Sequence, residues 1–390
     1  MKGGNVDLVV TAGRVLPRPD SVLTDGAVLV RDEQIVAVGG REDVLRQAPP
    51  SAVRHDFPAS TLLAGLFNSH LHLAFDAGPD TLGGLESDPL AGALERAKQL
   101  LSTGVTTVRD LGDSGHLAIS VRDALTGAAP RILAAGRPLT VPGGHCHFFG
   151  GEVAGDDEIR ALIDANAAAG ADVIKVMASG GQLTPGGANM WESQFDTRQL
   201  RVITEHAARH GLPVAAHAHG ADAIEASVAA GVDTIEHCTW MVGPQQVETR
   251  EPVGRRMAAD GIAACSTSSR NWRKMVERMG EEVAARVYGR LTWLEELGVP
   301  LIAGTDAGLP GSVFDDPVGA LELYEWLGFP RVRILEIATV ASARALGLSS
   351  ITGSLAPGLA ADLLVVRGDP LADLGALRDI DLVVARGHIA

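Results

Sequence analysis

Six polar residues lie near the ends of short apolar runs that are spread over most of the chain. They are His70, His72, Lys175, His217, His237 and Asp306. The runs, among them DVIKVM, PVAAH and DTIEH, are typical of buried β-strands. Imidazole and carboxylate groups are common metal ligands, and the C-terminal strand ends of a β/α barrel converge on one face. The pattern therefore indicates a metal-dependent hydrolase.

The pair His70 and His72 has a spacing that suits metal binding. On an extended backbone, residues two apart point to the same side, so the two imidazoles are presented together. Such a pair carries little weight alone, because single histidines are common on surfaces and in hydrogen-bonded cores. The recurrence of His217, His237 and Asp306 at equivalent strand ends argues against chance.

Lys175 alternates with Val173 and Met177, which places its ammonium group on the inward face of a buried strand. Burial disfavours the charged form and lowers the pKa of a lysine. Two interpretations follow. Lys175 pairs with a carboxylate such as Asp306, or its neutral amine captures carbon dioxide as a carbamate that bridges two metal ions. The spacing alone leaves both open.

Strand-like and helical segments alternate between residues 58 and 351, as in βαβ units with a parallel sheet. The Ala-rich helices expected at Asp157–Ala169 and Thr197–His210 are each followed by a glycine suited to end a helix. Eight strands are expected, the number that an α/β fold of the (β/α)8 TIM barrel type requires. They are Leu62–Leu66, Val105–Arg109, Arg131–Ala135, Val173–Val176, Val214–His217, Thr234–Glu236, Ile262–Cys265 and Leu301–Gly304.

Both chain ends contain short strands separated by turns. We expect residues 1–57 and 352–390 to form one small β-sandwich domain, and residues 58–351 to form the barrel. With 390 residues and 46% hydrophobic side chains, the chain is long enough to bury a large core.

The charge and the cysteine content limit which partners and which cellular location are expected. A net charge of −15 argues against nucleic acid as a partner. Three scattered cysteines predict no disulfide framework, and no apolar run is long enough to span a bilayer. We therefore expect a cytoplasmic protein, acting on a small amide or peptide without membrane contact, that forms a homo-oligomer.

Six motifs carry a resemblance to a known family: NSHLH at 68–72, GVTTVRDLG at 104–112, IKVMASGG at 174–181, VAAHAHG at 214–220, GVDTIEH at 231–237 and AGTDAG at 303–308. Together they resemble the amidohydrolase superfamily, in particular its Xaa-Pro dipeptidase-like and imidazolonepropionase-like metal-dependent hydrolases. The resemblance covers nearly the whole chain.

The resemblance implies two divalent metal ions, for which zinc is expected. His70, His72 and Asp306 would hold the more buried ion, His217 and His237 the more exposed one, and carboxylated Lys175 would bridge them. A metal-bound hydroxide would then attack an amide carbonyl, and Asp306 would accept the proton and pass it to the leaving nitrogen.

Further residues are candidates for substrate contacts. A second His-x-His pair, His145 and His147, follows the third strand in a glycine-rich loop. Arg109 lies at the end of the second strand. Its role stays undecided between a structural ion pair with a buried acid and a contact to the substrate. The predicted substrate contacts are His147, Trp191 as a wall of the pocket, and Arg270, which would bind a substrate carboxylate. His219 is predicted either to contact the substrate or to support a metal ligand without binding the metal itself.

The leading hypothesis is hydrolysis of an amide-type C–N bond in a dipeptide, an N-acyl amino acid or a related amide. The alternative is a cyclic-amide hydrolase of the imidazolonepropionase-like type. A deaminase fits less well, because by family resemblance the one-metal deaminases lack the lysine found here at position 175. A non-catalytic assembly subunit is a further alternative, although such relatives usually lose metal ligands.

Overall fold

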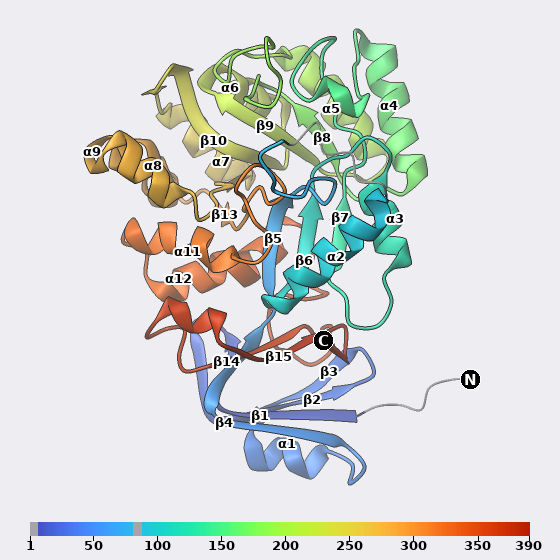
Figure 1. Ribbon diagram of the computed structural model, residues 1–390, viewed down its shortest axis with the longest axis vertical. Helices are drawn as coiled ribbons and strands as arrows, with labels where there is room; N and C mark the ends of the chain where they lie inside the picture. The colour runs from blue at the N-terminus through green and yellow to red at the C-terminus, as the bar shows by residue number, and fades with distance from the viewer. Residues whose placement is uncertain (1–6, 81–87) are drawn as a thin grey trace.

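The structure is a computed structural model that describes residues 7–80 and 88–390. The first six residues of the predicted small domain therefore lie outside the described part. Figure 1 shows a β-rich region that contains both chain ends, and a larger region of parallel strands and helices above it.

The β-rich region is one seven-stranded sheet with the order β16-β15-β14-β4-β1-β2-β3. Strand β4 is parallel to β1 and antiparallel to β14, so it joins the strands of the two chain ends. Strands from both chain ends therefore pair in one sheet. The strands are β1 (Asp7–Arg18), β2 (Ser21–Arg31), β3 (Gln34–Gly40), β4 (Val53–Ala64), β14 (Leu363–Arg367), β15 (Ile380–Ala385) and β16 (His388–Ile389).

This sheet curls around its own hydrophobic core. Val10, Val28, Leu62 and Val365, from four different strands, belong to one cluster of buried side chains. The backbone of Ile35 in β3 donates to Leu359 at 2.8 Å and accepts from Gly358, so the β3 edge meets the segment that leads into β14. On the other side, helix α1 (Arg41–Gln47) adds Val44 to a second cluster.

Eight parallel strands of the larger region fall into two sheets, with the orders β5-β6-β7 and β13-β12-β10-β9-β8. Backbone hydrogen bonds connect the sheets: Met177 donates to Leu139 at 2.8 Å, and Ser69 donates to Ala303 at 2.7 Å. The strands are β5 (Leu66–Leu71), β6 (Val105–Asp110), β7 (Arg131–Ala134), β8 (Ile174–Met177), β9 (Val214–Gly220), β10 (Thr234–Gly243), β12 (Ala263–Cys265) and β13 (Leu301–Ile302), with β11 (Gln246–Val247) antiparallel to β10.

Helices cover the outside of these strands (Figure 1). The main ones are α2 (Pro89–Ser102), α3 (Leu117–Ala124), α4 (Asp156–Ala169), α5 (Thr197–Arg209), α6 (Ala221–Ala230), α7 (Glu251–Asp260), α8 (Trp272–Met279), α9 (Glu281–Tyr288), α10 (Arg290–Glu296), α11 (Pro317–Trp326) and α12 (Arg331–Glu336). None of the helices in the described ranges is long and apolar enough to cross a bilayer.

Local sequence signals explain where α5 begins and where α4 ends. At the start of α5, the carboxylate of Asp196 accepts from Gln199 N at 2.7 Å, and the Gln199 side chain accepts from Asp196 N at 3.1 Å, a capping box. Helix α4 ends at Gly170, whose φ of 91° favours glycine. Both predicted helices are confirmed.

The prediction for the first barrel strand, Leu62–Leu66, is wrong. Residues up to Ala64 belong to β4 of the terminal sheet, and β5 begins at Leu66. The chain passes from one sheet to the other at Gly65, where a Cβ atom would lie 2.1 Å from the Oγ1 atom of Thr106. The apolar run LLAGLF is continuous across this point, so hydrophobic periodicity cannot mark it.

Candidate metal centre

One cavity of about 450 Å³ gathers all six predicted metal ligands. They come from different parts of the chain because the parallel strands end on the same side of the molecule. The cavity is lined by His70, His72, His145, Cys146, Lys175, Met177, Gln182, Leu183, Met190, His217, His219, His237, Asp306, Leu309 and Pro310.

His70, His72 and Asp306 form the first group of ligand atoms. The Asp306 Oδ1 atom lies 3.3 Å from Nε2 of His70 and 3.5 Å from Nε2 of His72. Ligand atoms at ~2.0–2.1 Å from a tetrahedral zinc ion are about 3.4 Å apart, so this spacing fits an ion held among the three. Oδ1 is buried and, within the described ranges, has no hydrogen-bond partner.

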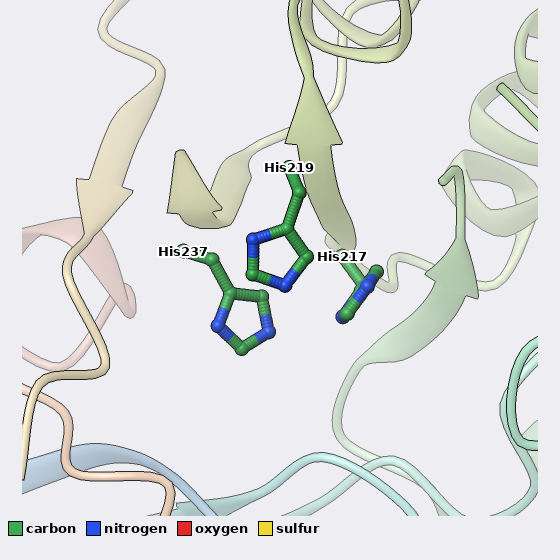
Figure 2. Close-up of side chains that lie close together, drawn as sticks. All are labelled: His217, His219 and His237. Carbon is green, nitrogen blue, oxygen red and sulfur yellow. The ribbon is translucent and has the colours of Figure 1, made fainter. Parts of the chain in front are cut away.

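His217, His219 and His237 form the second group. Their ligand atoms all lie within 4.8 Å of one another. Figure 2 shows the three rings turned toward one another, with His219 beside His237. The ring centroids of His219 and His237 are 4.3 Å apart, and those of His217 and His237 are 4.6 Å apart. His219 is therefore as well placed as His217 to act as a ligand.

Hydrogen bonds orient the rings. His72 donates from Nδ1 to Gly112 O at 3.1 Å, which leaves its Nε2 free. His217 donates from Nε2 to Gly180 O at 3.1 Å, which leaves its Nδ1 free. Nδ1 of His237 lies 2.6 Å from the Thr267 hydroxyl, so Nε2 is the free atom of that ring. Each histidine thus offers one nitrogen in a fixed orientation.

Lys175 lines the same cavity and is 1% exposed. Burial lowers its pKa to about 8. In the part of the chain that the structure describes, its Nζ atom has no hydrogen-bond partner. Lys175 therefore makes no hydrogen bond to Asp306 among the described residues, although the charges of Glu236 and Asp306 act on its amine. An orphaned buried amine beside a group of metal ligands fits a lysine that is modified or coordinated.

The protonation states of the candidate ligands also suit metal binding. Burial lowers the pKa values of His217 and His237 well below the usual range, and neighbouring positive groups add to this. Burial alone would raise the pKa of Asp306, but the imidazoles of His70 and His72, 3.3 and 3.5 Å from its Oδ1 atom, outweigh burial and hold the pKa of the carboxyl group well below its usual range. Neutral imidazoles and an ionised carboxylate are the forms that bind divalent metals.

Glu236 is a residue of the site that the sequence interpretation did not identify. It is fully buried, accepts from His70 Nδ1 at 2.8 Å and from Arg109 Nη2 at 2.7 Å, and so fixes the His70 ring. Arg109 is thereby a structural partner of Glu236, which decides the question that the sequence left open. The signal was present, since Glu236 directly precedes the predicted ligand His237.

The backbone around His237 is unusual. His237 has a φ of 67° and Cys238 a φ of 49°, values that non-glycine residues seldom adopt. Buried Arg290 donates from Nε to Cys238 O at 3.1 Å and supports this conformation. Alternation along a regular strand would turn neighbouring side chains to opposite faces. The turn at His237 instead lets Glu236 and His237 both reach His70.

The predicted substrate contacts fall in different places. His219 lines the cavity, whereas His147, Trp191 and Arg270 are not among its lining residues. His147 is exposed, because Cys146 has a φ of 57° and a short 3-10 turn follows, so the alternation assumed for a His-x-His pair does not hold. His145 lines the cavity instead, with its ring 4.6 Å from that of His217, and burial lowers its pKa to about 4.

Trp191 and Arg270 lie away from the cavity wall. Trp191 is half-buried, and its backbone packs close to Gly220. Arg270 is exposed and lines a separate cavity together with Asp316 and Arg378. A position just after a strand end places a residue on the side of the molecule where the parallel strands end, but the loop conformation decides whether its side chain points into the site.

The comparison with family models identifies the class of protein. The model of the Amidohydrolase family matches residues 61–390, so the chain belongs to this family and is a hydrolase that acts on C–N bonds. A model described as an imidazolonepropionase-like composite domain from bacteria matches residues 26–50. The alternative of a non-catalytic assembly subunit is therefore not supported.

Several individual proteins are similar over nearly the full length. An ochratoxinase from Aspergillus niger is 27% identical, covering 95% of this chain and 83% of the relative. An imidazolonepropionase from Chloroflexus aggregans is 24% identical, covering 94% of this chain and 91% of the relative. The crystal structure of a Xaa-Pro dipeptidase with bound methionine is 25% identical and has a TM-score of 0.85, covering 98% of this chain and 99% of that chain.

Proposed function

We propose that this protein is a binuclear metal-dependent amidohydrolase that cleaves an amide-type C–N bond. The observation that carries the proposal is that one cavity is lined by all six candidate ligands. They are His70, His72, Asp306, His217, His237 and Lys175, whose amine has no hydrogen-bond partner among the described residues. A single tetrahedral site uses only four ligands. Six such groups in one cavity favour two ions.

In this proposal His70, His72 and Asp306 hold the more buried ion, and His217 and His237 hold the other. Lys175, carboxylated by carbon dioxide, would supply a ligand to both ions. His217 is favoured over His219 because its side chain is the more deeply buried of the two. When bound, divalent ions such as zinc polarise the substrate carbonyl and supply a nucleophile at neutral pH.

The residues of the chain then have separate tasks. Asp306, ionised and without a hydrogen bond on Oδ1, accepts the proton of the attacking water and delivers it to the leaving nitrogen. Glu236 and Arg109 fix the orientation of His70. His145, kept neutral by burial, lies beside His217 where it can contact the substrate carbonyl.

The cavity wall favours a substrate with an apolar group. Beside the ligands it contains the side chains of Met177, Leu183, Met190 and Leu309. Apolar walls with a few polar groups are typical of sites for small organic ligands. A dipeptide, an N-acyl amino acid or a related amide fits this lining, and the names of the similar ochratoxinase and Xaa-Pro dipeptidase agree with that class.

A second candidate function is hydrolysis of a cyclic amide. It is favoured by the match of residues 26–50 to the imidazolonepropionase-like domain and by the similar imidazolonepropionase. The same ligands serve both reactions, since each breaks a C–N bond of an amide carbonyl. A deaminase is disfavoured by Lys175, whose amine lies among the ligands.

Two measurements test the proposal. Elemental analysis of protein reconstituted with zinc should find close to two ions in the centre, and one ion or fewer would contradict the binuclear assignment. The zinc-loaded protein should then be assayed with dipeptides, N-acyl amino acids, lactams and esters. Turnover of linear amides alone supports the leading function, whereas turnover of lactams alone supports the cyclic-amide alternative.

Other features belong to the same proposal. The hydrogen bonds from Met177 to Leu139 and from Ser69 to Ala303 support closure of the eight parallel strands into one barrel. The domain limits at residues 57 and 352, the cytoplasmic location and the homo-oligomeric state stay predictions.

A further inference from the structure

A second group of metal-ligand side chains lies on the outside of the barrel, between helices α4 and α5. Asp164 belongs to α4, His206 to the last turn of α5, and His210 is the residue that caps the C-terminal end of α5. The Nε2 atoms of His206 and His210 lie 2.7 and 2.6 Å from the same oxygen, Oδ1 of Asp164. Figure 1 shows these two helices side by side at the barrel surface.

We propose that Asp164, His206 and His210 form a further metal site for a late first-row divalent ion such as Zn²⁺. Histidines four residues apart on a helix present both rings on one face. Two imidazoles and one carboxylate, with the remaining coordination positions left to water, suit zinc, nickel or copper rather than calcium or magnesium. The site is separate from the cavity ligands, since none of its residues lines that cavity.

The orientation of His206 is set before any ion binds. Its side chain is 11% exposed, and its Nδ1 atom is buried without a hydrogen-bond partner among the described residues. An ion from solvent therefore reaches this ring only through Nε2, the atom that already faces Asp164. A fixed ligand loses little side-chain entropy on binding, which favours affinity.

The other two ligands can adjust. The side chains of His210 and Asp164 are 34% and 53% exposed. The present N–O distances are those of hydrogen bonds, and ligands of one tetrahedral zinc ion are about 3.4 Å apart, so the carboxylate must withdraw by roughly 0.7 Å. Rotation of the exposed Asp164 side chain provides this. When the ion binds Nε2 of each neutral ring, that nitrogen releases its proton to solvent and Nδ1 of the same ring takes one up, and water completes the coordination of the ion.

The position of the site gives it a structural consequence. Helix α4 leads into β8, which carries Lys175, and α5 leads into β9, which carries His217. An ion bound to Asp164 and the two histidines links the helices that precede these two strands. Because it binds the folded chain only, it stabilises the protein in proportion to the logarithm of its concentration above Kd.

The competing explanation is a metal-free contact in which both histidines donate to Asp164 near the C-terminal end of α5. Positive groups are favourable at that end of a helix. The two explanations differ in one measurable property, since only the metal site changes the amount of zinc that the chain binds.

Equilibrium dialysis against buffered free Zn²⁺, followed by elemental analysis, tests the proposal. The full-length double variant His206→Gln/His210→Gln should bind about one ion fewer than the wild-type chain. Asp164→Asn should lower the affinity for that ion by about 10–100-fold or more. The control is His388→Gln, an exposed histidine 4.0 Å from Glu33 that lies outside the cluster, which should leave zinc binding unchanged.

Equal zinc binding by the wild-type protein and the double variant would overturn the proposal and leave the hydrogen-bonded contact as the explanation. Thermal unfolding in a chelator checks that the variants are folded. If the double variant does not fold, the zinc affinity of Asp164→Asn decides the question. Because these residues line no part of the cavity, loss of the central ions would appear separately, as a deficit larger than one.

Discussion

Glu236 Oε2 accepts a hydrogen bond from His70 Nδ1 at 2.8 Å, with both side chains almost fully buried. The other oxygen of the same carboxylate accepts from Arg109 at 2.7 Å and from the Thr234 hydroxyl at 2.5 Å. Burial by itself would raise the pKa of Glu236, but Arg109 and His70 outweigh it and hold the pKa well below the usual range. An ionised carboxylate therefore directs the Nε2 atom of His70 toward Asp306.

Replacing Glu236 should disturb both metal binding and stability. Glu236→Gln leaves Arg109 without its charge partner in a buried position, and breaking such a pair costs about 3–5 kcal/mol. Metal affinity should fall by about 10–100-fold, because the orientation of His70 is weakened. Denaturant unfolding and zinc titration measure the two effects.

The control for Glu236→Gln is Glu251→Gln. Glu251 pairs with Arg255 at 2.6 Å, but both side chains are more than half exposed, so the change should cost no more than about 1 kcal/mol. A Glu236→Gln protein that unfolds and binds zinc like the control would show that the carboxylate does not position His70.

Replacing Asp306 separates proton transfer from metal binding. Asp306→Asn keeps the shape and one oxygen ligand but removes the basic group, so turnover should fall by about 10²–10⁴-fold or more. Zinc content should change less, because the histidines remain. His72→Ala, in contrast, should lose activity together with zinc. Near-normal turnover of Asp306→Asn would remove this residue from proton transfer.

Replacing Lys175 tests the carbamate. Lys175→Ala should lose zinc and activity, and short carboxylic acids such as acetate should restore part of both by entering the space of the missing group. Lys274→Ala, at an exposed lysine of α8, should behave as wild type. A structure of the active, zinc-loaded enzyme with a bare amine at Lys175 would contradict the prediction.

The cavity wall should decide substrate preference. Met190→Ala removes an apolar side chain that lines the cavity, and the kcat/KM for substrates with an apolar group should fall by about 10-fold or more. Arg270→Ala should leave kcat/KM nearly unchanged, because Arg270 lines a different cavity. A selective loss of activity toward substrates with a free carboxylate in Arg270→Ala would reinstate the contact expected from the sequence.

Gly304 tests how closely the strands pack beneath the ligands. A Cβ atom at this position would lie 2.4 Å from Cys265 Sγ and 2.9 Å from His70 Cβ. Gly304→Ala should therefore lower the free energy of unfolding by about 1–3 kcal/mol and weaken zinc binding through displacement of His70. Gly115→Ala, where a Cβ meets no heavy atom within 4 Å, is the control, measured by denaturant unfolding. Equal unfolding free energies would show that the strands relax freely.

The sequence by itself determined the α/β class, the β domain built from both chain ends, and the residues that line the cavity as candidate ligands. It did so because strand period, helix signals and the convergence of parallel strand ends are local or topological rules. Lys175 on the inward face of β8 follows from alternation alone, and the structure confirms its burial.

Only the tertiary structure decided the features that depend on backbone turns and on contacts between distant residues. The left-handed conformations at Cys146 and His237 reverse local alternation, which places His145 rather than His147 in the cavity and brings His237 to the side on which Glu236 contacts His70. The pairing of Glu236 with Arg109 joins residues 127 positions apart. No local sequence rule reports such contacts, because they arise from packing between strands that meet only in the folded chain.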